Sequence, residues 1–420
     1  MTSGKEARQG FVILADDLTS AGDGAAPFRR NGHEARILLS TPAAELPPRT
    51  GVTAVDLGTR LLDEDAAAAC TGRAARRFAG SVLLFKTVDS TLRGHVAAEL
   101  RAAWAGSRRR AVILAPAFPA EGRVTAEAVQ YVRGVPVHES EFARDPVHPV
   151  RCSDLTTVFP DAVAVGPDRA AELPGLIGRG ALIVCSAATD GDLGRLVAAV
   201  PRLDDVLWVG SPGLAAALAR RCAREDGPVP PAPAPARRPL VVVGSAHPAT
   251  RRQLAALRAR ADVRGVTVGN DPAPAVEALR ALAAPVLTVQ TPDERHAPHT
   301  ARVLARSLAA VVRTLAAERL VDALVVTGGE TAASVFQALG IDGIDLLDEP
   351  EPGVARGTPL GSSSLPVLIK AGGFGDDEML LRLCRLVRQP LSSSFMVRGR
   401  TRIELVERFR SSPDVEAAFD

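Results

Sequence analysis

A dense group of polar side chains directly follows the apolar run 82–85. Within eight positions it contains two cations, one carboxylate and three hydroxyls, which belong to Lys86, Thr87, Asp89, Ser90, Thr91 and Arg93. If 82–85 is a strand, these side chains lie at its carboxyl end, which is where open α/β sheets bind their ligands. This mixture of groups suits a small, oxygen-rich anion such as a sugar acid.

Lysine is rare in this chain, which makes Lys86 a candidate for a specific contact. Only Lys5, Lys86 and Lys370 occur among the 50 basic residues, and the others are arginines. A compact ammonium differs from a planar guanidinium in its reach and in the geometry of its donors. The alternative is that a composition rich in arginine left Lys86 and Lys370 at these places by chance.

Two adjacent carboxylates, Asp16 and Asp17, follow another apolar run, 11–15. At a strand end they can bind a sugar hydroxyl, hold a metal ion or act as a base. They can also simply begin a helix, because negative charge is favourable near a helix N-terminus. In that case Thr19 or Ser20 would be available as a helix cap.

We expect Asp89 to be the general base that accepts a proton from a substrate hydroxyl, with Asp17 as its rival. Lys86 or Arg93 would bind a substrate carboxylate, and arginine can do so through two parallel hydrogen bonds. The sequence does not identify metal ligands. The predicted substrate-binding residues are Asp16, Asp17, Lys86, Asp89, Ser90 and Arg93.

Three glycine-bearing segments stand out in the second half of the chain: 244–250 (GSAHPAT), 327–332 (TGGETA) and 370–376 (KAGGFGD). Each lies between an apolar run and a helical segment, where backbone N–H groups and the helix dipole can receive a phosphate. Three such loops favour a nucleotide site over plain tight turns. The sequence has no G-x-x-x-x-G-K-[ST] loop and no G-x-G-x-x-G opening, which argues against P-loop enzymes, protein kinases and Rossmann dehydrogenases.

Short apolar runs alternate with helical segments along the whole chain. The runs are rich in Val, Ile and Leu and do not alternate with polar residues, which is typical of strands covered on both faces. Such alternation of strand and helix predicts an α/β fold with mainly parallel sheets flanked by helices. The predicted strands are 11–15, 52–57, 82–85, 111–115, 181–185, 206–210, 240–243, 286–289, 323–327 and 366–370.

The chain of 420 residues is too long for one ordinary core, so we expect two domains with the active site between them. The segment 228–239 contains six prolines in twelve residues, which favours an extended spacer. We predict a sugar-acid-binding domain over 1–227, a linker over 228–239, a nucleotide-binding domain over 240–390 and a tail of unknown role over 391–420. The proline-rich stretch after 115 is either a lid or a structural loop.

Charge and composition restrict the partners. A net charge of +2 argues against a dedicated nucleic-acid surface. No apolar run approaches the roughly 20 residues of a membrane span, and residues 1–10 lack the apolar core of a signal peptide. The five cysteines are scattered without metal-ligand spacing. We therefore expect a cytoplasmic protein with no nucleic-acid or membrane partner, for which a homo-oligomer remains open.

From about Gly10 to about Arg388 the chain resembles the family of four-carbon acid sugar kinases. The motifs of this resemblance occur in the same order in both. They are 15–21 (ADDLTSA), 86–94 (KTVDSTLRG), 115–123 (APAFPAEGR), 145–146 (DP), 210–214 (GSPGL), 351–357 (EPGVARG) and the three glycine-bearing segments above. Ser20, where the family more often has glycine, and His247 and Pro248 depart from the usual pattern.

The resemblance implies ATP-dependent phosphorylation of a hydroxyl on threonate, erythronate or a 3-oxotetronate, with Mg²⁺ on the ATP phosphates. It implies that Asp17, Lys86, Asp89, Ser90 and Arg93 bind the sugar acid. For ATP the matching residues are Ser245, Gly328, Gly329, Glu330, Thr331, Gly372 and Gly373, to which the same loops add Thr250, Lys370 and Gly375. The alternatives are a kinase for another small hydroxy acid such as glycerate, and a non-catalytic aldonate-binding regulatory protein.

Overall fold

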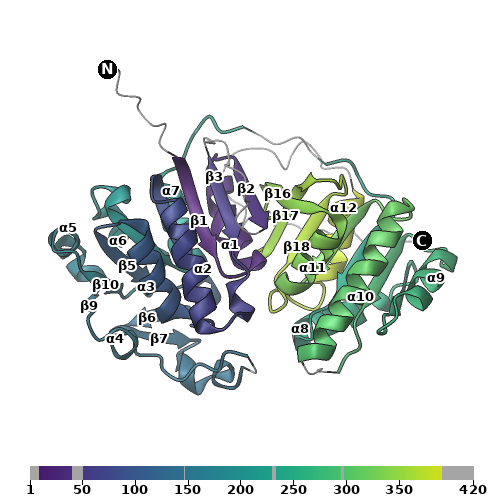
Figure 1. Ribbon diagram of the computed structural model, residues 1–420, viewed down its shortest axis with the longest axis horizontal. Helices are drawn as coiled ribbons and strands as arrows, with labels where there is room; N and C mark the ends of the chain where they lie inside the picture. Colours follow the sequence, from purple (N-terminus) through teal and green to yellow (C-terminus); the bar gives the residue numbers. More distant parts are fainter. Residues whose placement is uncertain (1–8, 40–50, 146, 229–232, 295–297, 390–420) are drawn as a thin grey trace, which may run out of the picture.

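The computed structural model describes residues 9–39, 51–145, 147–228, 233–294 and 298–389. The predicted tail 391–420 and residues 229–232 of the predicted linker lie outside these ranges. We call residues 9–228 the N-terminal half and residues 233–389 the C-terminal half (Figure 1). Within the described residues, no helix combines the length and the apolar character needed to cross a membrane.

The predicted α/β fold is confirmed, and its strands form one 15-stranded sheet that continues through both halves. The two halves are joined where β2 pairs with β16 in antiparallel fashion. In spatial order the strands are β13 (Val263–Thr267), β14 (Val286–Gln290), β12 (Pro239–Val243), β15 (Ala323–Thr327), β18 (Val367–Lys370), β17 (Val354–Gly361), β16 (Ile341–Asp348), β2 (Ala35–Leu39), β3 (Val52–Asp56), β1 (Gln9–Ala15), β4 (Ser81–Thr87), β11 (Val206–Gly210), β5 (Ala111–Ala115), β10 (Leu182–Cys185) and β9 (Val163–Val165).

Helices cover both faces of this sheet because successive residues of each strand point to opposite faces. In β1, Ile13 and Ala15 belong to one buried cluster, whereas Val12 and Leu14 belong to another. On the first face lie α1 (Leu18–Arg30), α5 (Leu173–Gly178), α6 (Asp190–Ala198), α7 (Pro212–Arg221), α9 (Ala273–Ala281), α10 (Pro298–Ala317) and α11 (Gly329–Leu339). On the other face lie α2 (Glu64–Arg77), α3 (Val96–Ser107), α4 (Leu155–Val158), α8 (Pro248–Arg258) and α12 (Met379–Arg388).

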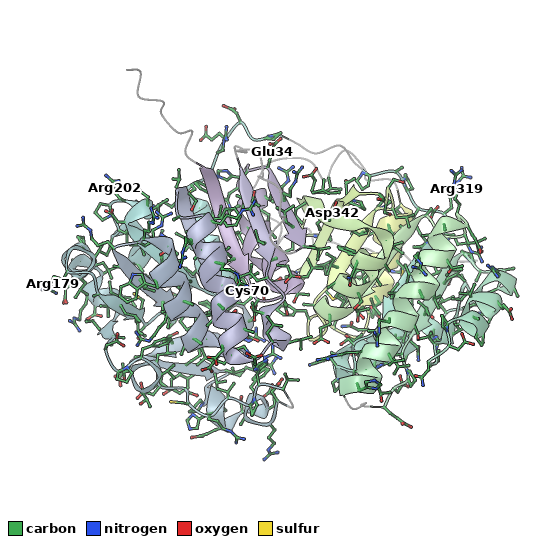
Figure 2. The ribbon with its side chains drawn as sticks, viewed as in Figure 1. Glu34, Cys70, Arg179, Arg202, Arg319 and Asp342 are labelled. Atoms are coloured by element: carbon green, nitrogen blue, oxygen red, sulfur yellow. The ribbon has the colours of Figure 1, made fainter. Side chains whose placement is uncertain are left out.

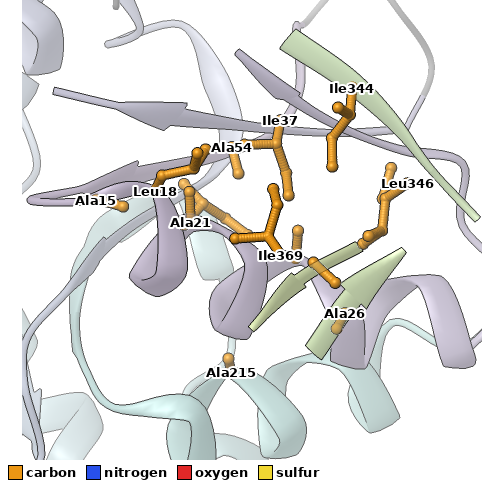
Figure 3. Close-up of a cluster of buried hydrophobic side chains, with 14 of the residues drawn as sticks. Ala15, Leu18, Ala21, Ala26, Ile37, Ala54, Ala215, Ile344, Leu346 and Ile369 are labelled. Carbon is orange, nitrogen blue, oxygen red and sulfur yellow. The ribbon is translucent and has the colours of Figure 1, made fainter. Parts of the chain in front are cut away.

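The core of the first face is continuous across the junction of the halves. Figure 3 shows Leu18 and Ile37 from the N-terminal half beside Ile344 and Ile369 from the C-terminal half. The described end of the predicted linker is also bound to the C-terminal half, because the backbone N–H groups of Arg237 and Arg238 donate to the carboxylate of Asp322. The halves are therefore joined by sheet pairing and by a shared core as well as by the linker.

The parallel parts of the two halves run in opposite directions, because the sheet reverses three times between β18 and β2. In a flat sheet their carboxyl ends would lie at opposite edges. Strands twist by roughly 20–25° from one neighbour to the next, so the six steps from β15 to β1 turn the strand direction by about 120–150°. This twist brings the carboxyl ends of both halves together, as the approach of Gly329 to Asp17 shows, and we call the region between these ends the cleft.

The proline-rich stretch after β5 forms a small antiparallel sheet of β6 (Arg123–Ala126), β7 (Val129–Val132) and β8 (Val135–Pro136). It is held against the N-terminal half by the buried Gln130, whose side-chain amide donates to the Ser90 carbonyl at 2.8 Å.

Surface cations are spread over both halves, as the outward-pointing Arg179, Arg202 and Arg319 in Figure 2 illustrate.

Candidate active site

The two adjacent carboxylates both lie in the cleft, at the end of β1. Asp17 caps α1, where its carboxylate accepts hydrogen bonds from the Ser20 backbone N–H at 2.7 Å and the Thr19 hydroxyl at 2.8 Å. Asp16 is buried, and one of its oxygens has no hydrogen-bond partner in the described part of the chain. Asp17 thus begins the helix, as one interpretation of the sequence expected, but the cap is Asp17 itself and not Thr19 or Ser20, which donate to it. Asp16 keeps one oxygen that could accept a hydrogen bond from a ligand.

Arg60 holds this pair of carboxylates and was not among the predicted residues. Its guanidinium donates to Asp16 at 2.8 Å, forms an ion pair with Asp17, and reaches the Ser20 hydroxyl at 3.1 Å. Burial alone would raise the pKa of Asp16, but Arg60 and then Lys86 outweigh it and lower that pKa. A signal for Arg60 did exist, because it follows the predicted strand 52–57, at the same edge as Asp16.

Asp89 lies in the same cleft with both carboxylate oxygens occupied. One accepts from the backbone N–H and the hydroxyl of Thr91, both at 2.8 Å, and the other accepts from Arg93 at 2.7 Å. Burial would raise the pKa of Asp89, but Arg93 and Arg60 hold it well below its ordinary value. A carboxylate held this way is a weak base, so the geometry disfavours Asp89 as the general base.

Arg93 and Ser90 lie beside Asp89, as predicted. Arg93 forms a second ion pair with Asp145 at 3.5 Å and packs its guanidinium 5.2 Å from the centre of the Phe142 ring. The Ser90 hydroxyl accepts a hydrogen bond from Arg123 at 3.1 Å. The loop after β4 is therefore braced by residues of the stretch 123–145.

Lys86, at the end of β4, is enclosed by the protein. Its side chain is fully buried, and its ammonium donates to the Thr87 carbonyl at 2.7 Å and pairs with Glu99 of α3 at 3.2 Å. Glu99 also accepts a hydrogen bond from Thr71 at 3.0 Å. The ammonium of Lys86 therefore has the internal partners that a buried charge needs, and its charge adds to that of Arg60 in lowering the pKa of Asp16. That Lys86 binds a substrate carboxylate stays a prediction.

Replacing Lys86 with methionine should reduce the free energy of unfolding by about 3–5 kcal/mol, because Glu99 would remain buried without its cation. Urea denaturation at pH 7 measures this loss. The double variant Lys86→Met/Glu99→Leu should recover much of it, since both charges are then removed together. A single variant as stable as the wild type would mean that the buried ion pair does not support the fold.

Two further carboxyl groups near Asp17 have raised pKa values. Burial, with the charge of Asp17, raises the pKa of Asp23 on α1 to about 7. Burial likewise raises the pKa of Asp56 at the end of β3 to about 7. Asp56 is buried and accepts a hydrogen bond from Gly58 at 2.8 Å. Asp23 is partly exposed, and within the described ranges it has no hydrogen-bond or ion-pair partner.

The three glycine-bearing loops meet at one place, at the carboxyl ends of β12, β15 and β18. A Cβ built on Gly244 would lie 2.1 Å from the Thr331 hydroxyl oxygen, and one on Gly372 would lie 2.6 Å from that of Ser245. Thr250 donates to the Gly372 carbonyl at 2.6 Å. These approaches leave no room for side chains, so the glycines allow the three loops to converge.

The other predicted residues of these loops differ in their surroundings. Lys370 is buried, donates to the Ala371 carbonyl at 2.8 Å, and has its pKa lowered by burial to about 8. Gly373 packs beside the His247 ring, 3.4 Å from a Cβ built on it. Gly375 has a φ of 84° and turns the chain against Met379.

The two halves face each other at the N-terminus of α11. A Cβ on Gly329 would lie 3.6 Å from the Asp17 carboxyl carbon and 3.5 Å from the Thr19 methyl. Gly328, with a φ of 89°, makes the turn into this helix, and its N–H donates to the Lys370 carbonyl at 2.8 Å. The surrounding protein and the charge of Asp17 raise the pKa of the neighbouring Glu330. The N-terminus of α11, a kind of helix end that can receive an anion, thus lies next to Asp17 at the end of β1.

Two family models match the chain, one in each half. Residues 11–218 match a family model described as a sugar-binding N-terminal domain, and residues 240–380 match one described as a nucleotide-binding C-terminal domain. The chain is 37% identical to a D-threonate kinase of Bordetella bronchiseptica, over 90% of this chain and 97% of that protein. It is 31% identical to a 3-oxo-tetronate kinase of Methylobacterium radiotolerans, over 86% and 95% of the two chains.

A solved structure from Haemophilus influenzae has the same fold. It superposes with a TM-score of 0.69 at 20% sequence identity, and the match covers 89% of this chain and 99% of that one.

Proposed function

Since the chain belongs to the family of four-carbon acid sugar kinases, we propose that it transfers the γ-phosphoryl group of ATP to a hydroxyl of a four-carbon sugar acid. The observation that carries this proposal is the approach of Gly329, at the start of α11, to Asp17, at the end of β1. A phosphate at this helix end would lie next to a hydroxyl held by the N-terminal half.

The sugar acid would lie among the groups at the ends of β1 and β4. Asp16 has a buried oxygen without a partner in the described chain, which suits a substrate hydroxyl. Arg93, whose side chain is one-third exposed, can offer donors to the carboxylate. Asp89 would orient Arg93, and Ser90 would contribute its hydroxyl.

We infer that Asp23, rather than Asp89 or Asp17, accepts the proton of the reacting hydroxyl. Asp89 and Asp17 are engaged by arginines, whereas Asp23 is not. Asp23 lies one helical turn after Thr19, and residues four apart share a helix face. That face carries Thr19, which contacts the start of α11. A carboxyl group with a pKa of about 7 is also matched to neutral pH.

ATP would lie across the three converging loops, with its phosphates on the N–H groups of Gly329 and Gly372, while Gly328 makes the turn that presents them. No group of three or more acidic, histidine or cysteine side chains in the described residues is arranged to hold a metal by itself. Mg²⁺ in kinases usually binds phosphates with one or two carboxylates. Glu330 and Asp17 fit this need, and a bound Mg²⁺ would neutralise phosphate charge.

Closure of the cleft would bend the sheet near the β2–β16 junction, because the halves are paired there. A swing about the predicted linker 228–239 alone would break this pairing. We therefore expect a small closing motion that excludes water, as phosphoryl transfer requires.

Substituting alanine for Gly244 should weaken ADP binding about tenfold, because its Cβ would push Thr331 and the start of α11 away. Overpacking of this kind costs about 1–3 kcal/mol, and 1.4 kcal/mol corresponds to a tenfold change in affinity. Titration calorimetry with ADP measures the effect. The control is Gly269→Ala, since nothing lies within 4 Å of a Cβ there; equal affinities for both variants would contradict the predicted nucleotide site.

The test of the proposed function is ATP consumption with a panel of four-carbon acids, followed by NMR identification of the phosphorylated product. The panel contains D-threonate, D-erythronate and 3-oxotetronate, with glycerate for comparison. We expect D-threonate to be the best substrate, since the relative with 37% identity is named for it. Preference for glycerate would favour the other small-acid kinase, and binding without turnover would favour the regulatory protein.

A further inference from the structure

Arg123 lies between the two halves of the molecule and is held there by the small sheet. It begins β6, and its backbone exchanges two hydrogen bonds with Phe118, at 2.7 and 3.1 Å. Gln130 of β7 ties the same sheet to the carbonyl of Ser90. The position of Arg123 over the loop after β4 is therefore fixed by backbone contacts rather than by its own side chain.

The guanidinium of Arg123 reaches from the N-terminal to the C-terminal half. One of its terminal nitrogens donates to the Ser90 hydroxyl at 3.1 Å. Its central carbon lies 5.9 Å from the centre of the Phe374 ring, which belongs to the loop after β18. Arg123 therefore contacts both a predicted sugar-acid loop and a predicted nucleotide loop.

The Nε–H group of Arg123 is buried and has no acceptor in the described part of the protein. A buried donor without a partner is unfavourable, and native proteins rarely leave one unused. The acid groups nearby do not use it, although the charge of Arg123 does act on the pKa of Asp23. An acceptor that is bound only with the substrates would satisfy this group.

We propose that Arg123 binds the phosphoryl group while it passes from ATP to the sugar acid, an inference that rests on the proposed function. The bond between the γ-phosphorus and the β–γ bridging oxygen breaks, and a bond from the same phosphorus to the sugar-acid oxygen forms. The hydroxyl proton goes to Asp23, and ADP leaves with the electron pair of the broken bond. Arg123 exchanges no proton and stabilises the charge on the equatorial oxygens.

An arginine suits this place better than a lysine because its planar fork matches two phosphate oxygens and stacks on an aromatic ring. Phe374 would orient the fork, while Ser90 would couple it to the sugar-acid loop.

The test compares Arg123→Met with Arg123→Lys and with the control Arg133→Met, an exposed arginine of the same small sheet. Arginines that contact the transferred group contribute about 10³–10⁵ in kcat, so we expect Arg123→Met to lose at least about 10³-fold. The lysine variant should recover part of this loss, and Arg133→Met should retain wild-type kcat.

A second measurement separates a direct contact from a structural role. Calorimetry with the sugar acid present gives the affinities for ADP and for ADP with aluminium fluoride, which resembles the transferred phosphoryl group. For Arg123→Met we expect the affinity for ADP to stay within about threefold while that for ADP with aluminium fluoride falls in parallel with kcat. Equal losses of both affinities would overturn the inference, because they would indicate a structural role.

Phe374→Leu provides a further control, since it removes the ring and keeps the cation. We expect it to lower kcat by less than about tenfold. An active wild type with an unaffected Arg123→Met variant would overturn this inference alone. A wild type that phosphorylates none of the acids would overturn the proposed function, and this inference with it.

Discussion

Replacing Asp23 with asparagine is expected to lower kcat by a factor of about 10²–10⁴, the usual contribution of a general base. Asparagine keeps the size and the hydrogen-bonding capacity of the side chain but cannot take up a proton. Binding of ADP should remain near the wild-type value, because Asp23 lies on α1 and not in the three glycine-bearing loops. Steady-state kinetics with calorimetry distinguishes these two effects.

The pH dependence identifies Asp23 more sharply than the loss of rate does. The wild-type kcat/KM should rise as the pH increases through about 7, since the base must be deprotonated. The kcat/KM of the Asp23→Asn variant should not show this rise with pH. The matched control is Asp56→Asn, because the pKa of Asp56 is also about 7 while its buried carboxyl is bonded to Gly58. If only the Asp56→Asn variant lost the rise of kcat/KM with pH, the group that must be deprotonated would be Asp56 and not Asp23.

Asp23 should also reduce the stability of the protein, and the sign of this effect follows from its raised pKa. The folded state disfavours the ionised carboxylate, so stability falls as the pH rises from about 4 through about 7. Asp23→Asn should therefore melt at a higher temperature than the wild type at pH 8, and the difference should vanish near pH 4. A lower melting temperature at pH 8 would show that Asp23 supports the fold instead.

The strand-end loops could be predicted from the sequence because the signal there is local. An apolar run followed by polar or glycine residues marked Asp16, Asp89 and Gly328, and parallel strands bring such ends together. Arg60, Asp23 and Arg123 were missed because their importance depends on the partners that they meet. Arg60 meets carboxylates more than 40 positions away, and its place after the predicted strand 52–57 was the one local signal for it.

Lys86 shows the limit of an argument from rarity. Its position at a strand end was predicted correctly, but its buried ion pair with Glu99 was not. Both Lys86 and Lys370 donate to the carbonyl of the next residue, at 2.7 and 2.8 Å. Whether a strand residue faces the ligand or the helices depends on its place in the pleat, which a continuous apolar run does not specify.

The sequence also did not predict that one sheet continues through both halves. Strand β16 is interrupted by polar residues and glycine, and β17 contains glycine and proline, so neither resembles the apolar runs of the parallel strands. The pairing of β16 with β2 joins residues about 300 positions apart. Only tertiary packing selects that partner, and it decides how the two halves of the cleft are oriented.

Replacing Arg60 with methionine should reduce the free energy of unfolding by about 3–5 kcal/mol at pH 7 and abolish turnover. The variant leaves Asp16 buried without its guanidinium partner, while Asp17 and Asp89 lose a nearby positive charge. The destabilisation should shrink as the pH falls below about 4, because the pKa of Asp16 is lowered in the folded protein and its stabilising charge is lost on protonation. Urea denaturation over this pH range measures it.

The control for Arg60 is Arg101→Met, which breaks the exposed pair of Arg101 with Asp161. Exposed pairs contribute about 0–1 kcal/mol, so this variant should keep nearly full stability and activity. If Arg60→Met were no less stable than Arg101→Met, the buried carboxylate of Asp16 would not depend on Arg60, and the predicted role of this arginine in holding the site together would be wrong.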